Sequence, residues 1–438
     1  MMMFKRNSKP RPKHHRVRPV FGFILLLTVF EAGVIFWVSR TPPPTGMSVL
    51  APPSSPAKAG TILGIDSVQY FNPVAAAALI RQNYPAGVPK EGIGITKITF
   101  RYRSELPTRQ MITIYGRAYL PDNGQSNLPI FAFAPGTTGI GDECAASLER
   151  PAAANWGNYD SHMSAYATQG YAAVTTDYEG MRDSGRIHHY MVGELEGRAL
   201  LDAVRGLRHL PQAAGRLSPT GVFLAGYSQG GHAAFWGDKI SDRYAPDVKA
   251  LGVVGFGPVM SVKQTLSDVT RGANLNWFGP NVVRSYEDYY HVTYPGIVLP
   301  SRELNLAAEV DAHCIDTDLS FWGHTPAGVY TPEFIASALA ETIPTQYPEF
   351  GKALDDNEVG AVSTSSAKRI NEGAKDTIVL PSQQAAAVPQ LCASSTGPVQ
   401  YMVYPNTTHY DAMLHSFGDT VAWMHALTDH QPVPSTCS

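Results

Sequence analysis

Charged residues are scarce in this chain of 438 residues. Asp, Glu, Lys and Arg together make up 16% of it, whereas about 25% is usual for a globular protein. The formal net charge is −3, so the folded surface offers no broad positive field of the kind that binds nucleic acid. We therefore expect no nucleic-acid partner.

Long apolar runs are also rare, and the clearest one lies near the N-terminus. Residues 20–38 are apolar apart from Thr28 and Glu31, and as a helix they would span about 28 Å, close to the thickness of a bilayer. Residues 1–19 hold seven of the 34 basic residues and no acidic one. Because basic flanks stay in the cytoplasm, we expect the rest of the chain to be extracytoplasmic, in the periplasm or at the cell surface.

Two interpretations of this apolar segment stay open. Either residues 20–38 remain as a membrane anchor, which the length of the run favours, or residues 20–30 form the core of a signal peptide that is cleaved before Gly60, for example after Ala59. In the second case the protein is secreted. A linker rich in Pro, Ser and Ala follows at residues 39–60, so the predicted folded domain occupies residues 61–438.

Cysteine is the third scarce feature. The chain has four, Cys144, Cys314, Cys392 and Cys437, which permit three pairings, and an oxidising compartment makes disulfides reasonable. We expect Cys144 to pair with Cys314, and Cys392 to pair with Cys437 so that the C-terminal tail is fastened. The sequence alone does not decide among the three pairings.

Residues 222–237, VFLAGYSQGGHAAFWG, carry the strongest motif of the chain. An apolar, β-forming run leads into Gly-x-Ser-x-Gly, and a segment that reads as the start of a helix follows. This context makes Ser228 a candidate nucleophile on a strained turn, where Gly226 and Gly230 avoid collisions that a Cβ would cause. The alternative is an ordinary Gly/Ser-rich turn. His232 lies in the first helical turn and is predicted to be structural.

The order of the predicted elements indicates an α/β fold. Strands alternate with helices around the Ser228 motif, which favours a mostly parallel sheet with helices on both faces. The predicted strands are residues 96–102, 111–119, 129–134, 171–177, 222–227, 250–259, 368–372 and 400–404, and the predicted helices are residues 67–81, 194–210 and 412–425.

The strand at residues 129–134 ends in Pro-Gly-Thr-Thr-Gly. Glycines after a buried strand let backbone N–H groups turn toward a ligand. We therefore expect the N–H groups of Thr137 and Gln229 to form an oxyanion hole. An ordinary Gly-rich turn is the alternative.

No metal or cofactor is predicted. His188 and His189 have no partner ligands at a metal-like spacing and are interpreted as part of a solvated loop. Residues 311–318 hold three aspartates and a histidine and resemble a ligand cluster. They also include Cys314, for which a disulfide is available, so we assign no metal there.

The sheet pattern stops between residues 260 and 366. Proline and glycine breaks in this insertion suggest short helices, and we interpret it as a cap over the nucleophile. Its aromatic side chains would line an apolar, water-excluding tunnel suited to acyl chains, although about half of them are expected to form the core of the cap itself. These residues are Trp277, Phe278, Tyr286, Tyr289, Tyr290, Tyr294, Phe321, Trp322, Tyr330, Phe334, Tyr347 and Phe350.

Two loops after the cap supply a candidate acid and a candidate base. Asp376 follows the predicted strand at residues 368–372, and His409 follows the last predicted strand. The order Ser228, Asp376, His409 is that of α/β-hydrolases, and such a triad transfers acyl groups without a cofactor. Asp411 is the rival acid, but its nearness to His409 in sequence makes a hydrogen bond between loops awkward.

Together these segments resemble the secretory lipase family, in the bacterial branch of its yeast lipase A-like group. The resemblance rests on the motifs APGTTGIGD and GYSQGGH and on the loop that carries Asp376, and it extends over about residues 65–430. It implies an α/β-hydrolase fold with a helical cap and the hydrolysis of acylglycerols or other apolar carboxylic esters. It also implies Ser228 as nucleophile, Asp376 as acid and His409 as base.

Other functions stay open at this stage. The same triad and oxyanion hole serve amides, so the sequence allows an extracytoplasmic serine peptidase, and no residue excludes acyl transfer to an alcohol or glycan instead of water. A membrane-tethered binding module that has lost catalysis is an alternative of another class. A broken triad would indicate such a module, whereas all three candidates are present here.

Overall fold

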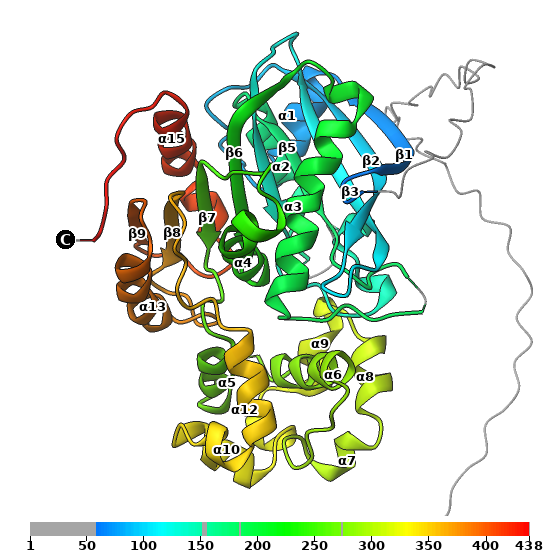
Figure 1. Cartoon of the computed structure of the whole chain (residues 1–438), viewed down its shortest axis with the longest axis vertical. Coiled ribbons are helices and arrows are strands. Elements are labelled where there is room, and N and C mark those ends of the chain that lie inside the picture. Colours follow the sequence, from blue (N-terminus) through cyan, green and yellow to red (C-terminus); the bar gives the residue numbers. More distant parts are fainter. Residues whose placement is uncertain (1–57, 151–155, 184, 273–274, 438) are drawn as a thin grey trace, which may run out of the picture. The chain divides into compact units, whose positions relative to one another are not determined.

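The structure, a computed structural model, describes residues 58–150, 156–183, 185–272 and 275–437 (Figure 1). The predicted basic tail at residues 1–19, the apolar segment at residues 20–38 and almost all of the linker lie outside the described residues. Within the described ranges, no helix combines the length and the hydropathy that crossing a membrane requires.

A nine-stranded sheet lies at the centre of the described residues, in the order β1-β2-β3-β5-β4-β6-β7-β8-β9. The first three strands pair antiparallel, and β4 to β9 pair parallel with one another, which confirms the mostly parallel sheet. The strands are β1 (Ile62–Phe71), β2 (Gly94–Glu105), β3 (Met111–Asp122), β4 (Leu128–Ala134), β5 (Ala172–Thr176), β6 (Leu217–Tyr227), β7 (Gly252–Phe256), β8 (Ala367–Gly373) and β9 (Val399–Tyr404).

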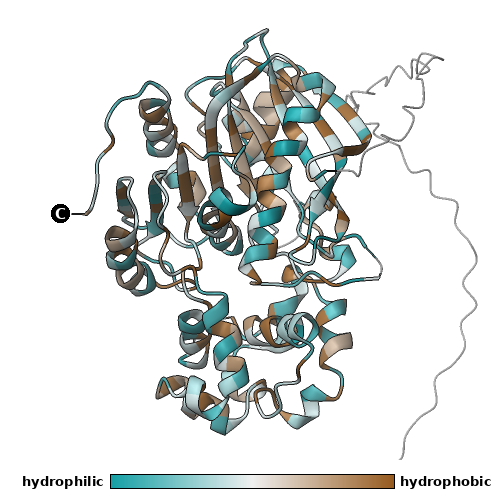
Figure 2. Ribbon diagram, in the orientation of Figure 1, coloured by the Kyte–Doolittle hydropathy of each residue, from teal (hydrophilic) through white to brown (hydrophobic). Residues whose placement is uncertain are grey.

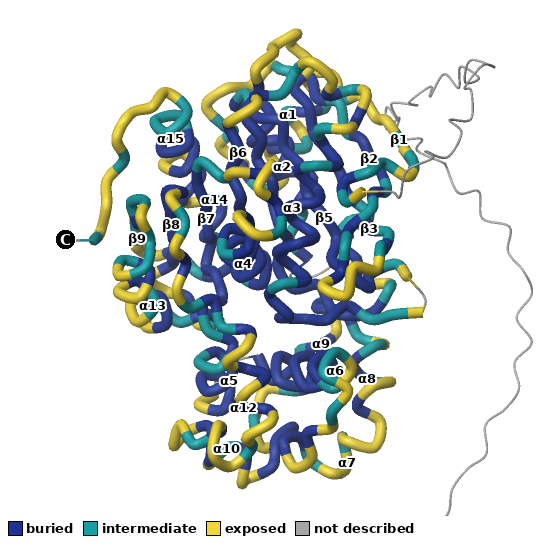
Figure 3. The backbone as a smooth tube through the Cα atoms, in the orientation of Figure 1, coloured by how far each residue is buried: buried dark blue, intermediate teal, exposed yellow. Residues whose placement is uncertain are grey.

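Helices cover both faces of this sheet. Successive side chains of a strand point to opposite faces: Ile130 and Ala132 of β4 join one hydrophobic cluster, while Phe131 and Phe133 join another. Hydrophobic residues concentrate along the strands (Figure 2). The central strands and the inner sides of the helices are buried, whereas the edge strands β1 and β9 are mostly intermediate or exposed (Figure 3). The first cluster includes α3 (Gly193–His209), α4 (Gln229–Tyr244) and α13 (Pro381–Ser394), and the second includes α1 (Pro73–Ile80), α2 (Tyr159–Thr168), α14 (Ala412–His415) and α15 (Phe417–Thr428).

The predicted helix at residues 67–81 is wrong in its first part. Residues 67–71 belong to β1, which pairs antiparallel with β2. Helix α1 begins only at Pro73, after Asn72, whose side chain accepts a hydrogen bond from the Ala75 N–H. Proline fits the first helical position and Asn is a favoured N-cap, so these two residues mark the true boundary. The alanine-rich run concealed the strand before it.

The predicted helix at residues 412–425 is divided in two. Ser416 separates α14 from α15, and its hydroxyl donates to the Ala412 carbonyl oxygen at 2.6 Å. A serine that bonds to the preceding turn competes with the regular helical pattern. The sequence pattern also missed α2, in which every residue is buried, and α13, which contains Pro389.

Residues between β7 and β8 form the expected helical cap (Figure 1). Aromatic residues pack in its interior: Phe334 and Phe350 lie with their ring centres 6.2 Å apart, and Tyr286 also contacts Phe350. The cap helices are α5 (Val262–Thr270), α6 (Phe278–Tyr290), α7 (Pro300–Glu303), α8 (Leu306–Ala312), α9 (Ile315–Trp322), α10 (Pro332–Leu339), α11 (Ile343–Gln346) and α12 (Pro348–Asp356).

Two disulfides connect distant parts of the chain, with the pairing expected from the sequence. Cys144 follows β4 and is bonded to Cys314, which precedes α9 of the cap. Cys392 of α13 is bonded to Cys437 in the C-terminal tail. The first disulfide therefore ties the cap to the loop that leaves β4.

Removing the disulfide between Cys144 and Cys314 should loosen the cap. For the variant C144A/C314A we expect the free energy of unfolding to fall by about 2–4 kcal/mol, measured by chemical denaturation, and limited proteolysis to cleave the cap faster than in the wild type. The variant C392A/C437A is the matched control, because its disulfide lies outside the cap and should not protect it. Equal rates of cap cleavage in the two variants would contradict this account.

Candidate active site

Ser228 occupies a strained turn between β6 and α4. Its φ and ψ angles are 54° and −115°, a region that residues with a side chain rarely adopt. The turn is possible because its neighbours have no side chain. A Cβ on Gly226 would lie 1.9 Å from the Gly230 carbonyl oxygen, and a Cβ on Gly230 would lie 1.8 Å from the Ala134 carbonyl oxygen.

Asp376 and His409 form a buried hydrogen-bonded pair. The Nδ1 atom of His409 lies 2.6 Å from Oδ2 of Asp376, and both residues are 3% exposed. The other carboxylate oxygen of Asp376 accepts backbone N–H bonds from Ile378 at 2.8 Å and from Val379 at 2.9 Å. These three contacts fix the carboxylate in one orientation, facing the imidazole.

The rival acid is engaged elsewhere. Oδ2 of Asp411 accepts a hydrogen bond from the Thr408 hydroxyl at 2.6 Å, within its own loop. Gly257, which follows β7, lies against the Asp376–His409 pair: a Cβ there would be 2.9 Å from Nδ1 of His409. The structure therefore brings Asp376, and not Asp411, to the imidazole.

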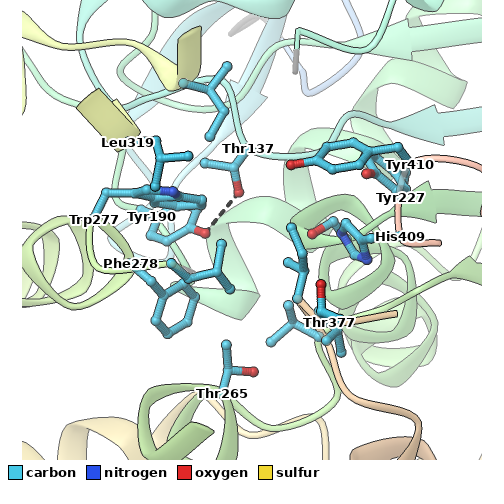
Figure 4. A pocket seen from close by; sticks show the side chains of 16 residues that line it. Thr137, Tyr190, Tyr227, Thr265, Trp277, Phe278, Leu319, Thr377, His409 and Tyr410 are labelled. Atoms are coloured by element: carbon cyan, nitrogen blue, oxygen red, sulfur yellow. Dashed lines mark hydrogen bonds between the residues drawn. The ribbon is translucent and has the colours of Figure 1, made fainter. Parts of the chain in front are cut away.

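Ser228 and His409 line the same cavity, which has a volume of about 170 Å³ (Figure 4). Figure 4 shows His409, Tyr227 and Tyr410 on one side and Trp277, Phe278 and Leu319 of the cap on the other. The cavity is lined by Thr137, Tyr190, Tyr227, Ser228, Val259, Thr265, Leu275, Trp277, Phe278, Ile315, Leu319, Thr377, Ile378, Val379, His409 and Tyr410. Its wall is therefore mainly apolar and is built from both the sheet ends and the cap.

The two predicted oxyanion-hole residues lie at the ends of neighbouring strands. Thr137 follows β4 and lines the cavity, and Gln229 begins α4 directly after Ser228. Within the described part of the chain, neither backbone N–H donates a hydrogen bond. Tyr190, which the sequence pattern did not single out, holds the loop in place through a 2.8 Å hydrogen bond between its hydroxyl and that of Thr137.

A buried polar network lies behind the nucleophile turn. The Gln229 side-chain amide donates to Oε1 of Glu196 at 2.7 Å, and Nδ1 of His232 lies 2.8 Å from Oε2 of the same glutamate. The remaining ring nitrogen of His232 lies 2.8 Å from the Asn357 carbonyl oxygen. His232 is thus a structural residue, as the sequence predicts.

The interpretation of His188 and His189 as part of a solvated loop is wrong. They are 1% and 6% exposed, because the loop packs against α6: the Ser285 hydroxyl donates to the His188 carbonyl oxygen, and the His189 ring lies 3.0 Å from Asp288. The ring of His188 lies 2.6 Å from the Gln229 amide nitrogen, and burial lowers its pKa to about 4. For His189, burial lowers the pKa, but bonds to Glu179 and Asp288 outweigh this and raise it overall. Both histidines are therefore structural partners.

The aspartates at residues 311–318 do not converge on a common point. Among the described residues, no group of three or more His, Cys, Asp or Glu side chains could hold a metal ion. Cys314 is used in a disulfide, and Asp318 is buried at 1% exposure. Burial raises the pKa of Asp318 to about 8.

Comparison with known proteins identifies the relatives of this chain. The model of the family described as "Secretory lipase" matches residues 158–435. Lipase A of Moesziomyces aphidis is 34% identical over 104 residues, which are 24% of this chain and 21% of that protein. Lipase 1 of Candida albicans is 27% identical over 184 residues, 40% of this chain and 38% of that protein. The chain thus aligns with well under half the length of these curated relatives.

Solved structures agree on the fold. The ligand-bound rice cell wall degrading esterase LipA of Xanthomonas oryzae superposes with a TM-score of 0.70 at 18% identity, covering 86% of this chain and all of that one. Candida antarctica lipase A in its closed state gives a TM-score of 0.64 at 18% identity, covering 87% and 85% of the two chains. The fold is that of α/β-hydrolases, and the chain belongs to the secretory lipase family.

Proposed function

We propose that the protein hydrolyses carboxylic esters through an acyl-enzyme formed on Ser228. The observation that carries this proposal is the buried hydrogen bond between His409 and Asp376 at the wall of the cavity that Ser228 also lines. Membership of the secretory lipase family supports ester hydrolysis as the reaction class. No cofactor is required, because the hydroxyl, the imidazole and the carboxylate supply the nucleophile and the proton transfers.

The reaction proceeds in two half-reactions. His409 accepts the Ser228 proton as the serine oxygen attacks the ester carbonyl, and the N–H groups of Thr137 and Gln229 hold the developing oxyanion. The protonated imidazole then gives its proton to the leaving alcohol. Water repeats the attack on the acyl-enzyme and releases the acid. Asp376 keeps His409 in the correct tautomer and stabilises its cation.

The substrate class follows from the walls of the cavity. Trp277, Phe278 and Leu319 of the cap face the sheet ends across a volume of about 170 Å³. Apolar walls favour an acyl chain over a polar or charged group, and the cap shields the reacting atoms from bulk water. We therefore assign acylglycerols or related apolar esters as substrates.

The protein acts outside the cytoplasm, which agrees with its family and with its two disulfides. We also propose that residues 20–38 keep the protein at the membrane. It rests on the length of the apolar run and the basic residues before it.

Replacing the nucleophile should abolish ester hydrolysis without unfolding the protein. For S228A we expect a loss of at least about 10³-fold in kcat, measured on esters with short and medium acyl chains. A fluorophosphonate reagent should label the wild type at Ser228 and leave S228A unlabelled. Undiminished turnover in a folded S228A protein would refute the assignment.

Two matched carboxylate variants test which aspartate serves His409. D376N should lower kcat by about 10³- to 10⁴-fold, because the amide presents the wrong partner to Nδ1. D411N should stay within about threefold of the wild type, since the Asp411 carboxylate accepts a hydrogen bond from Thr408 of its own loop. If D411N were the more damaging variant, the acid would be misassigned.

Mass spectrometry of the protein purified from its native host tests membrane retention. We expect an intact segment 20–38 in the membrane fraction, because the apolar run is long enough to span the bilayer. A mature N-terminus beyond Arg40 would show instead that the segment is removed.

A further inference from the structure

The last polar residue of β8 lies beside the candidate catalytic acid. Strand β8 is buried along its whole length although it contains Lys368, Arg369, Asn371 and Glu372. Most of these polar groups have evident partners: Lys368 donates to Ser395, and Arg369 donates to Asn371. Glu372, which is 0% exposed, is the exception that calls for an explanation.

The two oxygens of the Glu372 carboxyl group differ in their hydrogen bonding. One oxygen, Oε1, accepts the Gly373 N–H at 2.9 Å. The other, Oε2, has no hydrogen-bond partner among the described residues, and neither does Oε1 of Gln384, although the two side chains are in contact. Because Nε2 of Gln384 donates to the Pro258 carbonyl oxygen at 2.6 Å, the amide cannot simply be turned round. A proton on Glu372 would let its Oε2 atom donate a hydrogen bond.

The carboxyl group of Asp376 is the second acceptor within hydrogen-bonding reach of Glu372. Two buried carboxyl groups that share a hydrogen bond hold one proton between them, because two negative charges in contact would repel each other. Both oxygens of Asp376 already have partners, in two backbone N–H groups and the His409 ring, whereas Oε2 of Glu372 has none among the described residues. Glu372 accepts one backbone N–H. The proton therefore resides on Glu372.

The surroundings of Glu372 agree with a neutral carboxyl group. Burial raises its pKa to about 10, and repulsion from Asp376 adds to the effect. The groups that face it include the Asp376 carboxylate, the hydroxyl of Tyr401 on β9 and the neutral Gln384 amide of α13, whose hydrogen bond acts in the opposite direction and lowers the pKa.

We propose that Glu372 is a positioning residue, which keeps its proton and donates it in a hydrogen bond to the Asp376 carboxylate. The pair then carries one negative charge, held on Asp376 and directed at His409. The inference rests on the proposed function, because Glu372 acts on catalysis only by orienting Asp376, the proposed catalytic acid. An ionised Glu372 would instead repel Asp376 and leave its own Oε2 without a donor.

Two variants of similar volume separate this role from simple packing. E372L removes the donor, and we expect kcat to fall about tenfold or more while KM changes less than about twofold, because Asp376 loses a bond that orients it. E372Q keeps a neutral N–H donor and should recover most of that loss. Equal kcat in E372L and the wild type, or equal losses in E372L and E372Q, would overturn the positioning role.

A second measurement tests the proton itself and does not depend on activity. At a pH between the ordinary pKa of a glutamate and the raised pKa of Glu372 in the folded protein, only the folded chain keeps this proton. Folding therefore takes up one proton, and the free energy of unfolding falls as the pH rises. From pH 6 to pH 9 the folding equilibrium constant of the wild type should therefore fall tenfold per pH unit relative to that of E372Q. Parallel curves would show that Glu372 is ionised in the folded protein.

A failure of the Glu372 proposal and a failure of the proposed function give different results. Ester hydrolysis that survives in S228A would refute the catalytic assignment and, with it, the positioning role. If S228A is inactive but the unfolding curves of the wild type and E372Q run parallel, the shared proton alone is refuted.

Discussion

The site depends on one close approach between backbone segments. Ser228 is held at a φ of 54° because Gly226 and Gly230 allow the end of β6, the start of α4 and the end of β4 to touch. A Cβ at either glycine would overlap a carbonyl oxygen, so the turn could not form. The same contact places the loop after β4, and with it Thr137, next to the nucleophile turn. The oxyanion-hole candidates therefore follow from the geometry that exposes the serine.

The candidate acid and the candidate base reach this turn through the order of the parallel strands. Since the carboxyl ends of parallel strands meet at one edge of the sheet, Ser228 after β6, Asp376 after β8 and His409 after β9 converge there. Gly257, after the intervening β7, leaves room for the imidazole and the carboxylate to meet. The cap then closes the site with apolar side chains, and a disulfide ties it to the β4 loop.

Local patterns in the sequence were sufficient for strands β2 to β9, the cap and the nucleophile turn, and they suggested the cysteine pairing without deciding it. They failed where tertiary contacts override local preference: pairing with β2 draws residues 67–71 into a strand, and α6 buries His189 that would otherwise face water. Tyr190 and Glu372 carry no motif, because their roles depend on side chains far away in sequence. The polar character of β8, unusual for a buried strand, was the one visible signal that this segment does more than fill the core.

The central claim is that a hydroxyl, an imidazole and two backbone N–H groups converge on one reacting atom. A crystal structure of the protein after reaction with an alkyl phosphonate tests it most directly, because the adduct resembles the tetrahedral intermediate. We predict a covalent bond to Ser228, a phosphoryl oxygen at about 2.7–3.1 Å from the N–H groups of Thr137 and Gln229, and His409 facing the serine oxygen. An adduct at another residue, or a phosphoryl oxygen turned away from both N–H groups, would contradict the account.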